Sequence, residues 1–239
     1  MMYSYKDLFK SKLLDSFNYK KLNLSLLSDQ SSQFLIKSIK GYGIKRFFDF
    51  NVWEAPIDQI DNQILNQDSE FHKNKFDITI LFESSHSLLK KYNSTPNKKS
   101  FSDKQFKRVK KLLERLLTSN SDKIILFNYY ELNDQIFGNF SSKNKESFIY
   151  NLRRLNFLIS EFTSTINRVS ILDISSIQNK IGSENIFDSS LHINYGMVLN
   201  LDSLPYISKN IVDIISSFNS IFNKCLIVDL DNTMWGGIM

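Results

Sequence analysis

Short apolar runs alternate with longer segments of helical period along this chain, and this alternation restricts its fold more than any other feature. Five runs have the length and the Leu, Ile, Val and Phe content of strands: 22–27, 46–52, 77–82, 123–128 and 169–172. Parallel strands need a long crossover between them, usually a helix, whereas antiparallel strands can be joined by tight turns. The pattern therefore predicts a parallel α/β sheet with flanking helices.

The segments between the runs predict helices of different length. An amphipathic helix is expected over 5–17, where apolar side chains recur at helical spacing. A second helix is expected over 32–40, with Gly41 and Gly43 ending it. Segment 182–194 has no clear period and is predicted to be a loop.

The order of these segments divides the chain into four parts. They are a leading helix in residues 1–19, an α/β domain over 20–203, a connecting helix over 204–223, and the start of a second domain at 224–239. The second domain would begin with an apolar strand that runs into two carboxylates.

Composition and charge exclude several classes of protein. Hydrophobic residues make up 42% of the 239 residues and charged residues 23%, which is typical of a globular protein. A single cysteine, Cys225, rules out an internal disulfide framework, and no apolar run approaches the roughly 20 residues of a membrane span. The net charge is +5, but the lysines form no stripe interleaved with aromatic residues. We therefore expect a cytoplasmic protein that binds neither nucleic acid nor a membrane.

The last apolar run leads directly into a group of polar side chains. Asp229 and Asp231 follow it at a spacing of two, then Thr233 and a glycine pair. Side chains two apart on a strand point the same way, and ligands of α/β sheets bind outside the carboxyl ends of strands. Paired carboxylates are also suitable ligands for Mg²⁺. The plainer alternative is a buried strand that ends in a turn.

The sequence Asp-Leu-Asp-Asn-Thr-Met-Trp-Gly-Gly at 229–237 resembles the first catalytic motif of the haloacid dehalogenase (HAD) superfamily, in the form found in its FkbH-like branch. The resemblance implies that Asp229 attacks phosphorus, that Asp231 acts as acid and base, and that Thr233 binds the phosphoryl group. It also implies Mg²⁺ at Asp229 and Asp231. The other HAD motifs would have to follow Met239, so we expect this chain alone to be inactive as a phosphatase.

In FkbH-like proteins a domain related to SGNH hydrolases precedes the HAD domain, and 24–35 looks like the first strand and turn of such a domain. The expected fold is therefore flavodoxin-like or SGNH-like, followed by the first strand of a HAD domain. SGNH hydrolases carry a nucleophilic serine after that strand. The family's Gly-Asp-Ser, laid on 28–30, puts Gln30 at the nucleophile position, with Ser31 adjacent but out of register.

The other SGNH positions are matched only in part. Asn139, after Gly138, is a candidate for the oxyanion element. Asp188 and His192 are candidates for the acid and the base, but three residues separate them where the pattern has two. A serine is a useful nucleophile only beside a histidine that takes its proton. A degenerate SGNH-like domain that binds or positions something is therefore the favoured interpretation.

Three functions remain open. The resemblance implies a Mg²⁺-dependent enzyme that acts on a phosphorylated small molecule and delivers a glyceryl or acyl unit to an acyl carrier protein. A second hypothesis is an SGNH-type serine esterase. A third is a non-catalytic module that binds a carrier protein, for example through the basic helix at 107–111.

Overall fold

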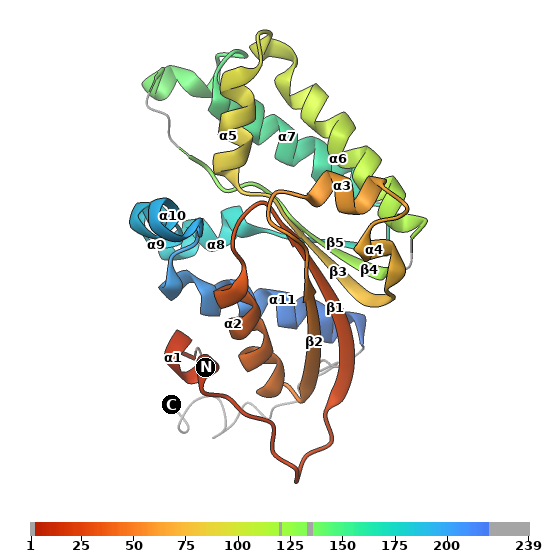
Figure 1. Cartoon of the computed structure of the whole chain (residues 1–239). Helices are drawn as coiled ribbons and strands as arrows, with labels where there is room; N and C mark the ends of the chain where they lie inside the picture. Colours follow the sequence, from red (N-terminus) through yellow and green to blue (C-terminus); the bar gives the residue numbers. More distant parts are fainter. Residues whose placement is uncertain (1–2, 120, 133–135, 220–239) are drawn as a thin grey trace, which may run out of the picture.

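The computed structural model describes residues 3–119, 121–132 and 136–219, and five parallel strands form its central sheet (Figure 1). The strands are β1 (Lys20–Ser28), β2 (Phe48–Glu54), β3 (Phe76–Phe82), β4 (Ser121–Phe127) and β5 (Val169–Leu172). Their order across the sheet is β2-β1-β3-β4-β5, and every neighbouring pair is parallel. The predicted parallel α/β fold is confirmed.

Helices cover both faces of the sheet. One face carries α2 (Gln33–Ile44), α8 (Ile174–Ile181) and α11 (Leu204–Phe218), with the short α1 (Tyr5–Phe9) packed beside α2. The other carries α3 (Ile60–Leu65), α4 (Glu70–Lys73), α5 (Ser85–Ser94), α6 (Phe101–Leu117) and α7 (Phe148–Thr163). Two short helices, α9 (Ser183–Ile186) and α10 (Ser189–Tyr195), precede α11, and three 3₁₀ turns lie at Lys98–Ser100, Gly138–Ser142 and Leu201–Ser203.

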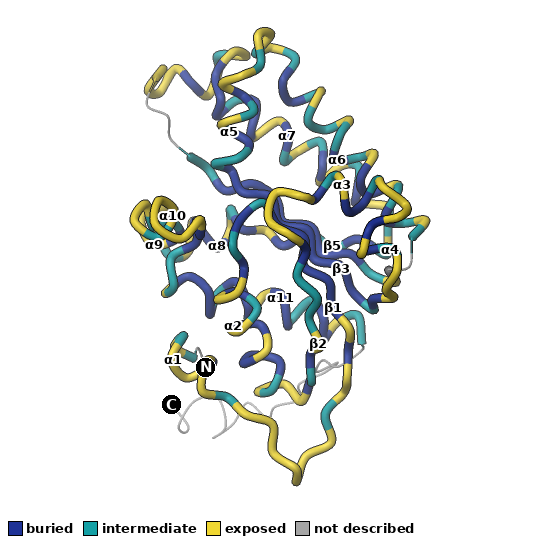
Figure 2. The backbone as a smooth tube through the Cα atoms, in the orientation of Figure 1, coloured by how far each residue is buried: buried dark blue, intermediate teal, exposed yellow. Residues whose placement is uncertain are grey.

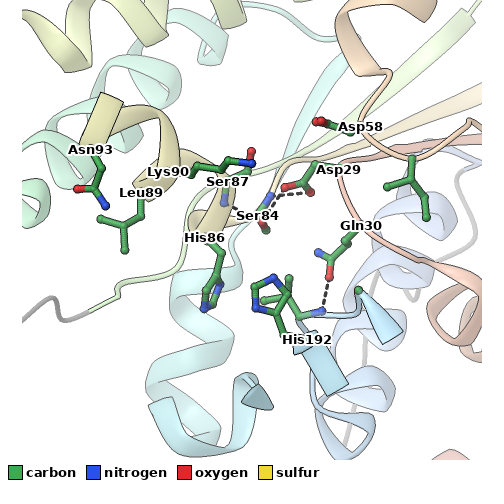
Figure 3. Close-up of a pocket in the computed structure, with 13 residues that line it drawn as sticks. Asp29, Gln30, Asp58, Ser84, His86, Ser87, Leu89, Lys90, Asn93 and His192 are labelled. Carbon is green, nitrogen blue, oxygen red and sulfur yellow. Dashed lines mark hydrogen bonds between the residues drawn. The ribbon is translucent and has the colours of Figure 1, made fainter. Parts of the chain in front are cut away.

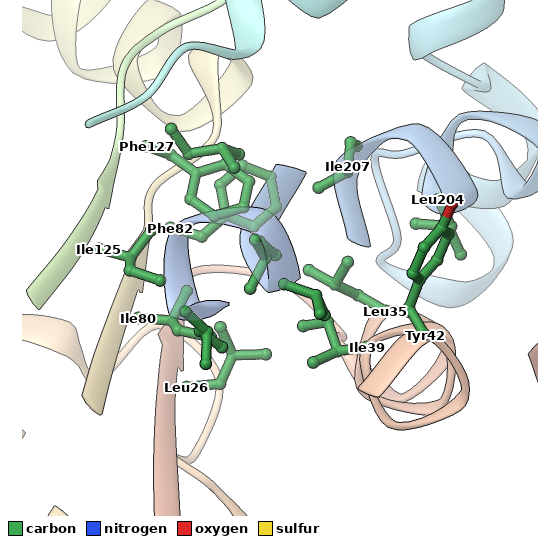
Figure 4. Close-up of a cluster of buried hydrophobic side chains, with 14 of the residues drawn as sticks. Leu26, Leu35, Ile39, Tyr42, Ile80, Phe82, Ile125, Phe127, Leu204 and Ile207 are labelled. Atoms are coloured by element: carbon green, nitrogen blue, oxygen red, sulfur yellow. The ribbon is translucent and has the colours of Figure 1, made fainter. Parts of the chain in front are cut away.

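Successive side chains of each strand point to opposite faces of the sheet, and each face has its own hydrophobic core. Leu26, Ile80 and Ile125 face α2 and α11, and Figure 4 shows them beside the inward side chains of those helices. Leu81 and Leu126 point to the opposite side and pack against α5, α6 and α7. All five are buried, and Figure 2 shows that burial follows the sheet and the helix sides that face it.

Helix α11 belongs to the domain and is not a separate connection. Its residues Ile207, Ile211, Val212 and Ile215 are fully buried in the core that α2 and the sheet share. It contacts α2, β4 and β5. The boundary placed at residue 203 is therefore corrected to at least Phe218, because the apolar stripe of α11 covers one face of the sheet.

The start of the chain differs from expectation in two respects. Helix α1 ends at Phe9 instead of residue 17, and Leu13 and Leu14 are about half exposed, so no core holds that stretch in a helix. Helix α2 runs through its two glycines to Ile44. A Cβ atom at Gly41 would lie 2.2 Å from the Leu8 carbonyl oxygen, and one at Gly43 would lie 2.4 Å from the Phe50 ring. The glycines permit close packing and do not end the helix.

Segment 182–194 also differs, since most of it is helical in α9 and α10. The Asp188 carboxylate caps α10 by accepting hydrogen bonds from the backbone N–H groups of Ser190 and Leu191. Helices this short have no measurable period, and the cap was the available signal. Among the described helices, none combines the length and apolar character needed to cross a membrane.

Candidate functional site

A cavity of about 700 Å³ lies at the carboxyl ends of β1 and β3. In the strand order β2-β1-β3-β4-β5, the direction in which strands are added reverses between β1 and β3. Ligands of open α/β sheets bind in the crevice at such a switch point. Figure 3 shows Asp29 and Gln30 entering this cavity after β1, Ser84 and His86 after β3, and His192 from α10.

Asp29 and Ser84 join the ends of the two central strands. The Ser84 backbone N–H donates to Asp29 Oδ1 at 3.0 Å, and its hydroxyl donates to Oδ2 at 2.6 Å. The same Ser84 hydroxyl oxygen caps α5 by accepting from the Ser87 N–H at 3.1 Å. Burial, with the charge of Glu83, raises the pKa of Asp29 despite the bonds from Ser84. This pair fixes the start of α5 against β1.

Gln30 forms another part of the wall and is only 5% exposed. Its Oε1 accepts a hydrogen bond from the Val198 backbone N–H at 2.6 Å. Its Nε2 is shielded from solvent and has no hydrogen-bond partner among the described residues.

Two histidines lie close together at the rim. The rings of His86 and His192 have centroids 5.1 Å apart, and Phe187 packs on the His86 ring at 4.3 Å. His86 Nδ1 is hydrogen-bonded to the Tyr130 hydroxyl at 2.7 Å. Burial, and then the nearby His192, lowers the pKa of His86 to about 4. His86 is therefore neutral over the physiological range.

This lowered pKa predicts a loss of stability in acid. Between about pH 6.5 and pH 4 the unfolded chain binds a proton at residue 86 that the folded chain does not, so the free energy of unfolding falls as the pH falls. The group is partly exposed, so we expect a loss of about 1–2 kcal/mol after solvent screening. Urea unfolding across this range should show a shallower fall for His86→Gln. Equal slopes for the two proteins would contradict the prediction.

A charged cluster around Glu83 and Arg108 lines a second pocket, which shares Asp29 and Asp58 with the cavity. Arg108 donates to both oxygens of Glu83, at 3.0 and 2.8 Å, and also binds Asp61 through two nitrogens. Lys91 pairs with Glu83, and the Tyr129 hydroxyl donates to Glu83 Oε2 at 2.6 Å. Burial works against ionisation of Glu83, but Arg108, Lys91 and Tyr129 outweigh it and lower its pKa. Glu83 is therefore held as a carboxylate although it is only 8% exposed.

The SGNH-like candidates are brought together only in part. His192 and Gln30 line the same cavity, and Ser31 adjoins it, with its backbone N–H bonded to the Gly196 carbonyl at 3.1 Å. The Asp188 carboxylate caps α10, and among the described residues it forms no hydrogen bond with the His192 ring. Neither His86 nor His192 forms a hydrogen bond with a serine hydroxyl in the described part of the chain. Asn139 lines a different cavity, of about 450 Å³.

The phosphoryl site that the sequence predicts belongs to the end of the chain. Asp229, Asp231 and Thr233 lie outside the described residues, and their roles stay predictions. Within residues 3–119, 121–132 and 136–219, no group of three or more His, Cys, Asp and Glu side chains is arranged to hold a metal ion.

Sequence reasoning missed Ser84 and His86 as members of the site. Both come shortly after the buried strand β3, and this position is the feature of the sequence that could have identified them as site residues. That position becomes informative once β3 is known to pair with β1, because the residues after these two strands then meet at the crevice.

Comparisons with known proteins agree with this architecture. The model of the FkbH N-terminal domain matches residues 23–216. The N-terminal part of the protein BF1531 from Bacteroides fragilis, a structure described as containing a phosphatase domain complexed with Mg, is 35% identical with a TM-score of 0.89. The match covers 99% of this chain and 62% of that one, so this chain spans less than two thirds of its relative.

A second structure shares the fold alone. A protein from Parabacteroides merdae ATCC 43184, named for its likeness to GDSL lipases, is 10% identical with a TM-score of 0.54, over 82% of this chain and 96% of its own. No curated protein matches the chain.

Proposed function

The chain belongs to the FkbH family, whose N-terminal domain it matches over most of its length, and we propose that this domain holds the substrate of a phosphoryl-processing protein without hydrolysing it. The cavity at the ends of β1 and β3 is the proposed binding site. Its position at the switch point of the sheet supports a role in binding.

The proposal that the domain does not hydrolyse its ligand rests on one feature of the site. In the register that the resemblance implies, Gln30 takes the place of the nucleophilic serine of an SGNH hydrolase, and an amide is not a nucleophile that His192 could activate. Ser84, the hydroxyl of the opposite wall, donates to Asp29 and caps α5, so it serves the architecture of the site. An ester in this cavity would meet hydrogen-bonding groups and no activated nucleophile.

The chemistry of the whole protein is also part of the proposal. Asp229 would form an aspartyl-phosphate, Asp231 would protonate the leaving group and activate water, and Thr233 would bind the phosphoryl oxygens. Mg²⁺, when bound at Asp229 and Asp231, would neutralise charge on the phosphoryl group. The relative described with a phosphatase domain and Mg supports this assignment. A phosphorylated small molecule would be the substrate, and an acyl carrier protein would receive the glyceryl or acyl unit.

Labelling with a serine-directed fluorophosphonate tests whether the domain is a binding domain or an esterase. We expect intact-mass measurement of the folded chain to show no adduct, because no described serine hydroxyl is bonded to His86 or His192. A serine hydrolase treated in parallel is the positive control. Stoichiometric labelling of one serine would instead support the serine esterase hypothesis.

A further inference from the structure

The geometry points to an uncharged carbonyl compound, an ester, thioester or amide, as the ligand of the cavity between β1 and β3, with its carbonyl oxygen accepting a hydrogen bond from Gln30 Nε2. This inference rests on the proposed function, in which the domain binds its ligand without cleaving it. It adds the chemical class of the ligand and the residue that recognises it.

The orientation of the Gln30 amide is set by the backbone. The Val198 N–H donates to Oε1 at 2.6 Å, so the oxygen must lie on that side and the NH₂ group on the other. Figure 3 shows the nitrogen turned toward the space between Ser84 and His192. A buried donor without an acceptor is costly and rare in folded proteins, and it calls for a partner.

The wall leaves that donor without an acceptor. Both oxygens of Asp29, the neighbouring carboxyl group, already accept hydrogen bonds from Ser84. On the opposite wall α5 begins, and the N–H groups of its first turn, at Ser85 and His86, have no carbonyl acceptor within the helix. At Gln30 Nε2, a carbonyl oxygen of a ligand would supply the acceptor that the neighbouring wall does not.

Charge distinguishes a neutral carbonyl from a carboxylate or phosphate. Two carboxyl groups, Asp29 and Asp58, line the cavity against a single lysine, Lys90, and so disfavour an anion. Ile57, Leu89 and Val198 supply apolar surface for the rest of the ligand. This combination of a few fixed polar groups and apolar walls is usual for small-molecule sites.

Binding of S-acetyl-N-acetylcysteamine to the full 239-residue chain tests the inference. This molecule is uncharged and carries a thioester and an amide carbonyl. We expect it to bind and to shift the NMR signals of the Gln30 side-chain NH₂ group. In Gln30→Glu, Oε1 can still accept from Val198 but the donor is lost, so we expect affinity to fall about tenfold or more. The exposed Gln33, three residues away, provides the matched control Gln33→Glu, which should bind as the wild type does.

The outcomes separate this inference from the proposed function. Release of free thiol by the wild-type chain would overturn the binding-only function itself. A probe that is neither bound nor cleaved would overturn the inference alone and leave water as the partner of Gln30. Equal affinity in wild type and Gln30→Glu, or tighter binding of the carboxylate S-succinyl-N-acetylcysteamine, would also overturn it. If Gln30→Glu fails to fold, the test uses the NMR signals of the Gln30 side-chain NH₂ group in the wild type. Signals that do not shift when the probe is added would then overturn the inference.

Discussion

Replacing Arg108 with methionine is expected to lower the free energy of unfolding by roughly 3–5 kcal/mol. Glu83 is 8% exposed and receives two of its hydrogen bonds from this guanidinium. Methionine fills a similar volume, so the main change is a buried carboxylate that has lost its principal counter-charge. Lys91 and Tyr129 still contact Glu83 and should keep the loss within this range. Urea unfolding at neutral pH measures the effect.

Two further variants show whether charge is the cause. Arg153→Met makes the same replacement in the exposed pair with Glu131, where we expect a loss below about 1 kcal/mol. Adding Glu83→Gln to Arg108→Met removes the uncompensated carboxylate, so the double variant should be more stable than the single one. If the double variant is less stable than Arg108→Met, the loss comes from packing and this explanation is wrong.

The second large effect is expected from Phe82→Ala, which should cost roughly 3–5 kcal/mol. The Phe82 ring stacks on Phe127 with centroids 4.4 Å apart, and the two side chains are 1% and 2% exposed. Figure 4 shows both rings between the sheet and Ile207 of α11. Truncation would leave a cavity that two strands and a helix cannot close together.

Phe157→Ala provides the matched control, because this phenylalanine of α7 is 65% exposed. We expect its free energy of unfolding to change by no more than about 0.5 kcal/mol, as is usual for a surface substitution. Similar losses for the two variants in thermal or urea unfolding would show that the ring stack contributes little beyond local helix and strand preferences.

The sheet could be predicted from the sequence because buried parallel strands have a composition that little else in a chain shares. The run over 77–82 is the clearest case, and β3 begins one residue earlier. Helix ends were less predictable where tertiary contacts decide them. Gly41 looked like a helix end, but the carbonyl group of Leu8 packs against it and the helix continues. Residues 10–17 have apolar side chains at helical spacing, but these side chains are exposed and the segment is not helical.

The site was predictable in its parts and not in its assembly. Gln30 and His192, which the sequence singled out by their order along the chain, line one cavity. Asn139 could not be excluded by sequence, because its distance from that cavity depends on how the segment after β4 folds. His86 was given no role, since its significance arises from the pairing of β3 with β1.

Because α11 is the last helix described, the part of the sheet face that it covers stays open until residues 204–218 have been synthesised. The five strands have all left the ribosome once Leu172 has emerged, yet Ile207 to Ile215 are still to come. At roughly 5–20 residues per second, the nascent chain then exposes Ile80, Ile125 and their neighbours for several seconds. In that interval the chain should be a substrate for ribosome-associated chaperones, and any destabilising change in α11 would prolong it.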